Sequence, residues 1–241
     1  MTKKLKLTQG EERKFYVKRM FNAIARRYDL LNHLLSFGID ILWRKKAIRK
    51  LNVAADGLVL DLACGTGDFA LETIRQKKCR VVGVDIAAQM LVFGNRKKQI
   101  KKEGKRLCFA NGDGERLPFA DNTFDGATIA FGIRNMGDMD QALREFARVL
   151  KSGAALVVLE FSLPQFKPFR AVYLFYFKHI LPHIGALISG DREAYSYLPL
   201  SVGEFPSVPD FRRKMEQAGF TNINHWRLLN GVAVIYRGRS I

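Results

Sequence analysis

The chain has 241 residues, 48% of them hydrophobic and 26% charged, and these fractions exclude a disordered chain and favour one globular domain over residues 1–241. Lys and Arg outnumber Asp and Glu by 40 to 23, so the net charge of +17 favours anionic partners such as nucleic acid or lipid head groups. No Cys-x-x-Cys pair, signal peptide or membrane-spanning run is visible, which argues against a zinc site and a disulfide framework and predicts a cytoplasmic protein.

The N-terminal segment predicts an amphipathic helix between Glu11 and Tyr28. Its apolar side chains recur at helical spacing, at Val17, Phe21, Ile24, Ala25 and Tyr28. Residues 1–50 precede the first strand, so we expect them to form a helical cap over the strand ends. Tyr28 has two open interpretations, a core aromatic residue or a residue of the site.

The stretch from Val59 to Asp68 reads as a strand, a tight turn and a helix start. Gly65 and Gly67 allow a sharp turn and a close approach of a ligand to the main chain. A dinucleotide site would need a third glycine, which is absent, whereas Asp61 lies four residues before the first glycine. A carboxylate there suits a cationic ligand, and the Asp-x-x-x-Gly-x-Gly pattern resembles the cofactor corner of S-adenosylmethionine (AdoMet) methyltransferases.

Further polar residues follow the next strands. Asp85 ends the strand predicted at Arg80–Asp85, where a carboxylate can accept the hydroxyl groups of a ribose. Ile86 follows it and could cover an adenine face or lie in the core. After a short strand near Arg106–Ala110, Asp113 and Gly114 form a turn in which the carboxylate could accept an adenine amine.

The fourth predicted strand, Asp125–Phe131, leads into Gly132-Ile133-Arg134-Asn135. Ligands of open parallel sheets bind beyond the carboxyl ends of the strands, so Arg134 and Asn135 are candidates for the substrate site. A helix starting at Asp138 and a fifth strand, Ala155–Glu160, complete a β-α-β-α-β-β-α-β pattern.

Residues 162–205 form an insertion of different character, rich in aromatic residues with basic residues between them. It suits a lid over an apolar substrate, an element lying on a membrane surface, or an added helix pair that closes the core. His179 and His183 lack a carboxylate partner nearby, so no metal site is predicted. A helix over 208–218 and an antiparallel pair of strands, 222–228 and 232–237, end the chain.

Several longer stretches resemble the ubiquinone/menaquinone biosynthesis C-methyltransferase family over nearly the whole chain. These stretches are Phe21 to Asn32, Phe131-Gly132-Ile133-Arg134-Asn135, Leu159-Glu160-Phe161-Ser162 and Gly190 to Leu198. The resemblance implies a doubly wound, Rossmann-like α/β fold with a seven-stranded sheet whose last strand is antiparallel. It also implies methyl transfer from AdoMet to a ring carbon of a polyprenylated quinol, typically demethylmenaquinol, with a ubiquinone precursor as a second acceptor.

Carried over by position, the resemblance implies cofactor contacts at Thr66, Asp85, Asp113 and Gly114. Ala130 stands where the family often has a small hydroxyl residue, so only a main-chain contact is expected there. For catalysis we expect the guanidinium of Arg134 to stabilise a phenolate, while Asn135 and Tyr28 orient the quinol oxygens. A sulfonium is already a good leaving group, so no metal is needed.

Three alternatives remain at this level. The basic charge would suit an RNA or DNA methyltransferase, although the sequence lacks an Asn/Asp-Pro-Pro-Tyr motif and an appended RNA-binding module. A small-molecule O- or N-methyltransferase is the second alternative. The third is an AdoMet-binding structural partner in a quinone-synthesis assembly, without chemistry of its own. The oligomeric state is left open.

Overall fold

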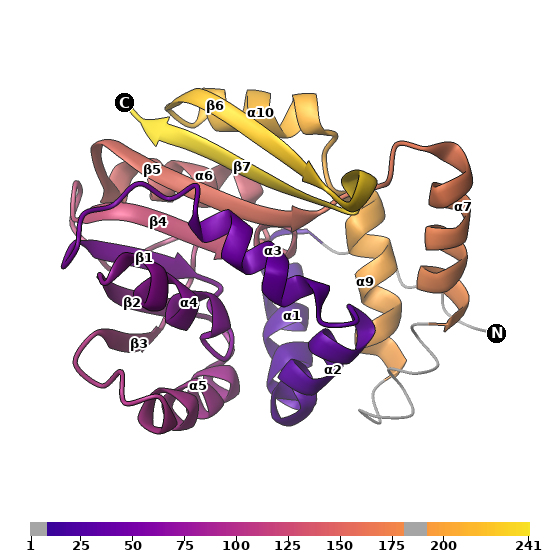
Figure 1. The fold of residues 1–241 in the computed structure, drawn as a ribbon, viewed down its shortest axis with the longest axis horizontal. Helices are drawn as coiled ribbons and strands as arrows, with labels where there is room; N and C mark the ends of the chain where they lie inside the picture. Colours follow the sequence, from indigo (N-terminus) through magenta and orange to yellow (C-terminus); the bar gives the residue numbers. More distant parts are fainter. Residues whose placement is uncertain (1–8, 181–191) are drawn as a thin grey trace.

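A computed structural model describes residues 9–180 and 192–241 of the chain. Its centre is a seven-stranded sheet with the order β3-β2-β1-β4-β5-β7-β6 (Figure 1). The strands are β1 Leu58–Leu62, β2 Arg80–Asp85, β3 Leu107–Asn111, β4 Phe124–Ala130, β5 Leu150–Phe161, β6 Phe220–Leu228 and β7 Ala233–Ser240. Only β7 runs antiparallel to its neighbours, β5 and β6, which confirms the expected doubly wound fold with an antiparallel last strand.

Side chains of each central strand alternate between two hydrophobic layers, because successive residues of a strand point to opposite faces. In β5, Val157 and Leu159 belong to one layer while Leu156 and Val158 belong to the other. The first layer is covered by α3 Ile39–Ile48 and α4 Asp68–Lys77 and the second by α6 Met139–Val149 and α10 Val208–Gln217. Both faces of the sheet are therefore buried, as expected for parallel strands.

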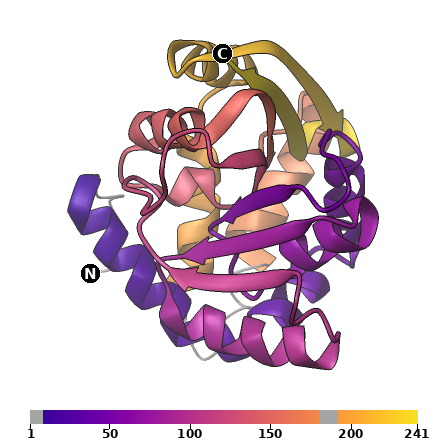
Figure 2. The same cartoon turned by 90° about the vertical axis from the view of Figure 1, so that its left-hand side faces the viewer.

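Two N-terminal helices lie beside the carboxyl ends of the strands. They are α1 Gly10–Ile24 and α2 Tyr28–Leu35, and Figure 2 shows the arrowheads of the central strands pointing to the side on which α1 lies. The predicted single helix from Glu11 to Tyr28 is thus wrong at its end, since a 3-10 turn at Ala25–Arg27 separates the two helices. The break turns α2 so that Asp29 reaches the turn after β1.

The remaining helices complete the wall at the same end of the sheet. α5 Ala88–Ile100 follows β2, α7 Lys167–Phe175 continues into a π-helical turn at Tyr176–Ile180, and α9 Arg192–Glu204 lies beside α7 (Figure 1). The glycine-containing segment expected at 189–191 lies outside the described residues. No helix in the described ranges has the length and apolar character needed to cross a bilayer.

Candidate functional site

In the turn after β1 three residues have left-handed backbone angles, and one of its glycines has free space beside the main chain. Ala63, Gly65 and Gly67 have φ angles of 50°, 56° and 86°. A Cβ atom at Gly67 would lie 2.7 Å from Phe109 Cζ, so close packing requires glycine there. At Gly65 the nearest atom to such a Cβ is Tyr28 Cε1, 3.7 Å away. Gly65 therefore leaves the main chain accessible on the side of α2, where a ligand can approach it.

Asp85 connects this turn to the end of β2. Its Oδ2 accepts a hydrogen bond from Gly65 N at 2.8 Å, and its Oδ1 accepts one from Ala87 N at 2.8 Å. Burial raises the pKa of the Asp85 carboxyl to about 6. A carboxylate has about four acceptor positions, so Asp85 can take hydroxyl hydrogens of a ligand in addition to these two main-chain donors.

A small pocket opens over the turn and is lined by eight of the predicted site residues. They are Tyr28, Gly65, Asp85, Ile86, Asp113, Gly114, Ala130 and Asn135. They come from α2 and from the ends of β1 to β4, which the sheet brings together. A Cβ atom at Gly114 would lie 2.9 Å from Leu62 Cδ2, so this position also requires glycine.

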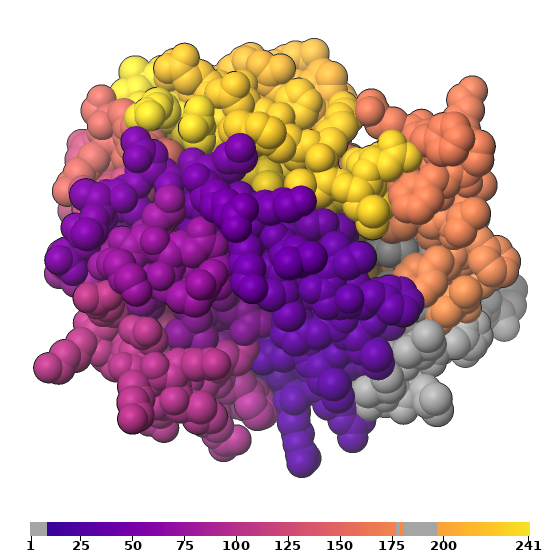
Figure 3. All heavy atoms as spheres, in the orientation of Figure 1, coloured from indigo at the N-terminus to yellow at the C-terminus, as the bar shows by residue number. Residues whose placement is uncertain are grey.

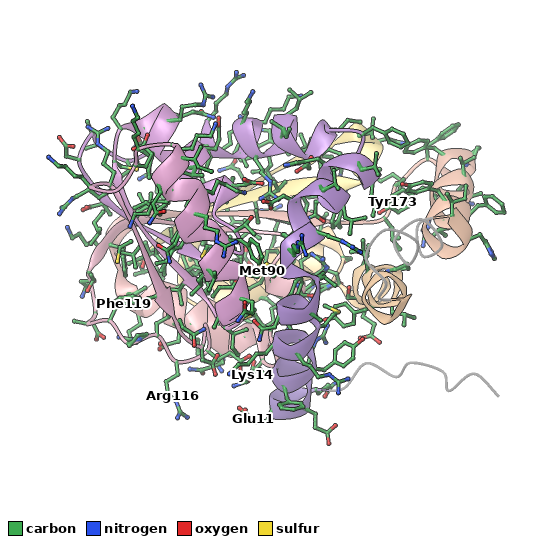
Figure 4. All side chains as sticks on the ribbon, turned by 90° about the horizontal axis from the view of Figure 1, so that it is seen from below. Glu11, Lys14, Met90, Arg116, Phe119 and Tyr173 are labelled. Atoms are coloured by element: carbon green, nitrogen blue, oxygen red, sulfur yellow. The ribbon has the colours of Figure 1, made fainter. Side chains whose placement is uncertain are left out.

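Lys14 of α1 closes the pocket beside Asp113 and was not predicted from the sequence. Its Nζ lies 2.9 Å from Asp113 Oδ2 and 3.1 Å from Glu115 Oε2. Lys14 lines the pocket together with Met90 of α5, and Figure 4 labels both side chains. The sequence gives no local signal for Lys14, because it is one of many basic residues on an amphipathic helix.

Asp61 lies beneath the turn in the interior of β1 and lines neither this pocket nor the larger one described below. Its Oδ1 accepts a hydrogen bond from Thr128 Oγ1 at 2.7 Å, whereas its buried Oδ2 has no hydrogen-bond partner among the described residues. Burial raises the pKa of the Asp61 carboxyl to about 7. An unpartnered buried carboxylate oxygen close to the turn is suited to a cationic ligand.

Thr66 and Gly67 also lie outside the lining of both pockets. The hydroxyl of Thr66 donates a hydrogen bond to Asp29 of α2 and accepts one from Lys97 Nζ at 3.1 Å. Lys97 forms ion pairs with Asp29 and with Asp68. This cluster fastens α2 to the turn. Thr66 therefore contacts α2 and α5 and neither of the two pockets in this structure.

A larger cavity of about 380 Å³ adjoins the small pocket and is mostly apolar. Phe131 and Phe161 stack on its floor with ring centroids 4.4 Å apart, and Trp43 packs against both rings. The wall on the far side includes Tyr173, which is buried on α7 (Figure 4). Phe21, Tyr28 and Phe131 line both the cavity and the small pocket, so they form the boundary between them.

Arg134, like Tyr28, is a predicted catalytic residue that lines the larger cavity. It is buried, and its Nη1 donates hydrogen bonds of 2.6 Å to Glu160 Oε1 and to the main-chain oxygen of Phe131. Burial raises the pKa of the Glu160 carboxyl, and the Arg134 guanidinium opposes this shift. Glu160 was not predicted as a site residue, although its place at the carboxyl end of β5 is the signal that marked Asp85.

Asn135 lies on the side of the small pocket, whereas Tyr28 lies at the boundary. The Asn135 side chain lines the small pocket, accepts a hydrogen bond from the Tyr197 hydroxyl at 3.1 Å and donates one to Phe131 O at 3.3 Å. Tyr28 packs edge-to-face on Phe21, with centroids 5.8 Å apart. Burial raises the pKa of the Tyr28 phenol, so the hydroxyl stays protonated and can donate a hydrogen bond at neutral pH.

No group of His, Cys, Asp and Glu side chains that could hold a metal ion occurs within residues 9–180 and 192–241. His179 is exposed and its ring lies against Phe175, while His183 lies outside the described residues.

Comparison with known proteins identifies relatives over the full chain. The chain is 45% identical over 237 residues to the ubiquinone/menaquinone biosynthesis C-methyltransferase UbiE of Geotalea uraniireducens, covering 98% of this chain and 99% of that protein. It is 42% identical over 224 residues to the demethylmenaquinone methyltransferase of Porphyromonas gingivalis, covering 92% of this chain and 91% of that protein.

Solved structures agree on the fold. One is the crystal structure of a SAM-dependent methyltransferase, possibly a histamine N-methyltransferase, from Thermotoga maritima, with a TM-score of 0.67 and 19% identity over 92% of this chain and 99% of that chain. At this identity the likeness concerns the fold alone. The family model described as "ubiE/COQ5 methyltransferase family" matches residues 7–240. This match and the relatives, which align over almost their whole length, show that the chain belongs to the ubiE/COQ5 methyltransferase family.

Proposed function

We propose that the chain transfers a methyl group from AdoMet to a ring carbon of a polyprenylated quinol, with demethylmenaquinol as the first candidate. The observation that carries the proposal is the pair of adjoining pockets that share Tyr28 and Phe131. One is small and carries carboxylates at strand ends, and the other is large, aromatic and contains a buried arginine. The printed names of the relatives from Geotalea and Porphyromonas support this choice of substrate.

Three features of the chain support AdoMet binding at the small pocket. Asp85 keeps acceptor positions for ribose hydroxyl groups, Gly65 leaves the main chain accessible, and Asp61, beneath the turn, has a buried carboxylate oxygen without a hydrogen-bond partner. Bound there, AdoMet supplies an electrophilic methyl group on a positively charged sulfur, and the ring carbon that takes the methyl group loses one proton. Ala130 lines the same pocket and offers only its main chain.

The residues at the boundary of the pockets have separate tasks in this proposal. Arg134 lines the quinol cavity and stabilises negative charge on the hydroxyl oxygen next to the reacting carbon, because a guanidinium stays protonated. The Tyr28 hydroxyl orients a quinol oxygen by donating a hydrogen bond. Asn135, which Tyr197 holds in place, positions ligand atoms on the cofactor side. The aromatic lining excludes water from the reacting atoms.

We also propose that the mouth of the large cavity rests on an anionic membrane, from which the prenylated substrate enters. Phe37, Val172 and Phe175 are each more than half exposed, and Phe37 and Val172 line the cavity. The exposed cations Lys167 and Arg170 lie on α7, which forms an edge of the molecule in Figure 3. Apolar side chains beside basic ones are typical of surfaces that bind anionic lipid.

The test of the proposed reaction is incubation with AdoMet and a panel of naphthoquinols and benzoquinols under anaerobic conditions, with products read by mass and methyl position. We expect methylation at a ring carbon of demethylmenaquinol and a large loss of rate in Arg134→Ala. Methyl transfer to RNA without any quinol product, or a near wild-type rate in Arg134→Ala, would contradict the proposal. For the membrane contact, Phe175→Asp should weaken co-sedimentation with phosphatidylglycerol vesicles, and the exposed Val92→Asp of α5 serves as the matched control.

A further inference from the structure

The large cavity holds a second guanidinium, that of Arg44 on α3, which neither the sequence patterns nor the proposed mechanism uses. Its side chain is 11% exposed, and its guanidinium carbon lies 5.3 Å from the centroid of the Phe131 ring. Among the described residues Arg44 forms no hydrogen bond, and the one contact of its buried Nε is an ion pair with Asp40 at 3.5 Å. Because Arg44 lines the cavity and its guanidinium donates no hydrogen bond to the described residues, its donors are available to an acceptor oxygen of a ligand.

The two arginines of the cavity differ in how far their charge is balanced. Arg134 donates to Glu160 at 2.6 Å, and Glu160 makes no ion pair with another described residue. Arg44 has one ion pair, with Asp40, at the longer distance of 3.5 Å. Asp40 Oδ1 also accepts from Ser36 Oγ at 2.7 Å, and Asp40 Oδ2 lies 3.0 Å from His33 Nδ1. The Asp40 carboxylate therefore makes its short contacts with Ser36 and His33, and its distance to Arg44 is longer than that between Glu160 and Arg134.

The two guanidiniums contact the two rings of the stacked aromatic pair in the cavity. Arg44 lies over Phe131, and Arg134 lies 5.4 Å from the centroid of Phe161, the other ring of the stacked pair. They come from different walls, Arg44 from α3 and Arg134 from the 3-10 turn Ile133–Asn135. Both act on the phenol of Tyr28, which therefore lies in the electrostatic field of each.

We propose that Arg44 is a further catalytic residue, which binds the quinol oxygen para to the oxygen that Arg134 stabilises. This inference rests on the proposed quinol methylation. Through its free donors Arg44 fixes the ring orientation and spreads the negative charge of the quinolate over both oxygens. A mono-hydroxylated ring lacks the group that Arg44 would bind, so Arg44 also selects para-diols against simple phenols.

The test compares two acceptors that differ only in this oxygen, a short-chain 3-prenyl-1,4-naphthalenediol and its 4-deoxy analogue. In the wild type we expect the diol to be preferred about 10- to 100-fold in kcat/KM, as for loss of a hydrogen bond to a charged group. In Arg44→Gln the preference should fall to near one, mainly by loss on the diol. Arg44→Lys should restore part of it. Lys46 is an exposed residue of the same helix. Lys46→Gln also removes one positive charge and should keep the wild-type preference.

Binding provides an independent readout, because Trp43 lines the cavity and its fluorescence reports on ligands without turnover. We expect Arg44→Gln to weaken binding of the diol about 10- to 100-fold and to leave the deoxy analogue nearly unchanged. Equal losses on both acceptors in Arg44→Gln and Arg44→Lys would overturn the inference and assign Arg44 to packing against Phe131. A wild type that binds the acceptors with the expected difference but methylates neither would refute the quinol reaction and still support the role of Arg44.

Discussion

Glu160→Gln removes the anion that balances the buried guanidinium of Arg134. Glu160 is fully buried and accepts hydrogen bonds from Arg134 Nη1 at 2.6 Å, from the Arg134 main chain at 3.3 Å and from the Phe161 main chain at 2.8 Å. Glutamine has one acceptor oxygen for these donors and carries no charge. Removing one partner of a buried ion pair costs about 3–5 kcal/mol, so we expect the free energy of unfolding to fall by this amount.

The assay is urea unfolding followed by circular dichroism, with three comparison variants. Lys151→Gln removes a surface ion pair of the same 2.6 Å length, to Asp125, and should cost less than about 1 kcal/mol, because solvent screens it. Arg134→Met alone leaves the Glu160 carboxyl unpaired. The double variant Arg134→Met/Glu160→Leu leaves no buried charge and should be more stable than Glu160→Gln. A double variant that is no more stable than Glu160→Gln would refute the reasoning, since removing both charges would then cost as much as leaving one of them unpaired.

Three further predictions concern the small pocket and the residues around it. Because burial raises the pKa of Asp61 to about 7 and a bound sulfonium favours its ionised form, AdoMet affinity should rise with pH between 5.5 and 7.5, by at most about 10-fold per unit. Calorimetry should show a flatter profile for S-adenosylhomocysteine and for Asp61→Asn, and equal slopes would contradict the assignment. Gly67→Ala, with its Cβ 2.7 Å from Phe109, should lower the free energy of unfolding by about 1–3 kcal/mol in thermal melts; no loss would mean that the turn can relax. Tyr197→Phe frees Asn135 Oδ1 and should reduce kcat/KM about 10-fold at little cost in stability, whereas unchanged kinetics would remove Asn135 from the site.

The sequence predicted the central helices and strands well, because the signals for them lie within the segments themselves. The strand Arg80–Asp85 has the predicted bounds, and the helix Asp68–Lys77 starts where the glycine turn predicted a helix start. The predicted strands over 222–228 and 232–237 form, but the second pairs with β5 as well as with β6 and so lies inside the sheet. Pairing between distant strands has no signature in either segment.

The parts of the site that the sequence missed depend on contacts between distant segments. Glu160 and Arg134 are 26 residues apart and Lys14 and Asp113 are 99 apart, so no spacing pattern connects them. Arg44 resembles the other basic residues around it until α3 is packed over Phe131. Position at a strand end, by contrast, correctly placed Asp85, Asp113, Arg134 and Asn135 beside the two pockets. The roles of these residues stay predictions.

The cluster of Thr66, Asp29 and Lys97 has a consequence for the affinities of the two ligands. Asp29 fastens α2 to the turn over which the small pocket opens, and its neighbour Tyr28 forms a wall of both pockets. A ligand that stabilises the turn therefore also stabilises the wall against which the second ligand packs. By linkage the two affinities are coupled with the same factor in both directions. In the proposed reaction we therefore expect bound AdoMet to tighten quinol binding without touching the quinol.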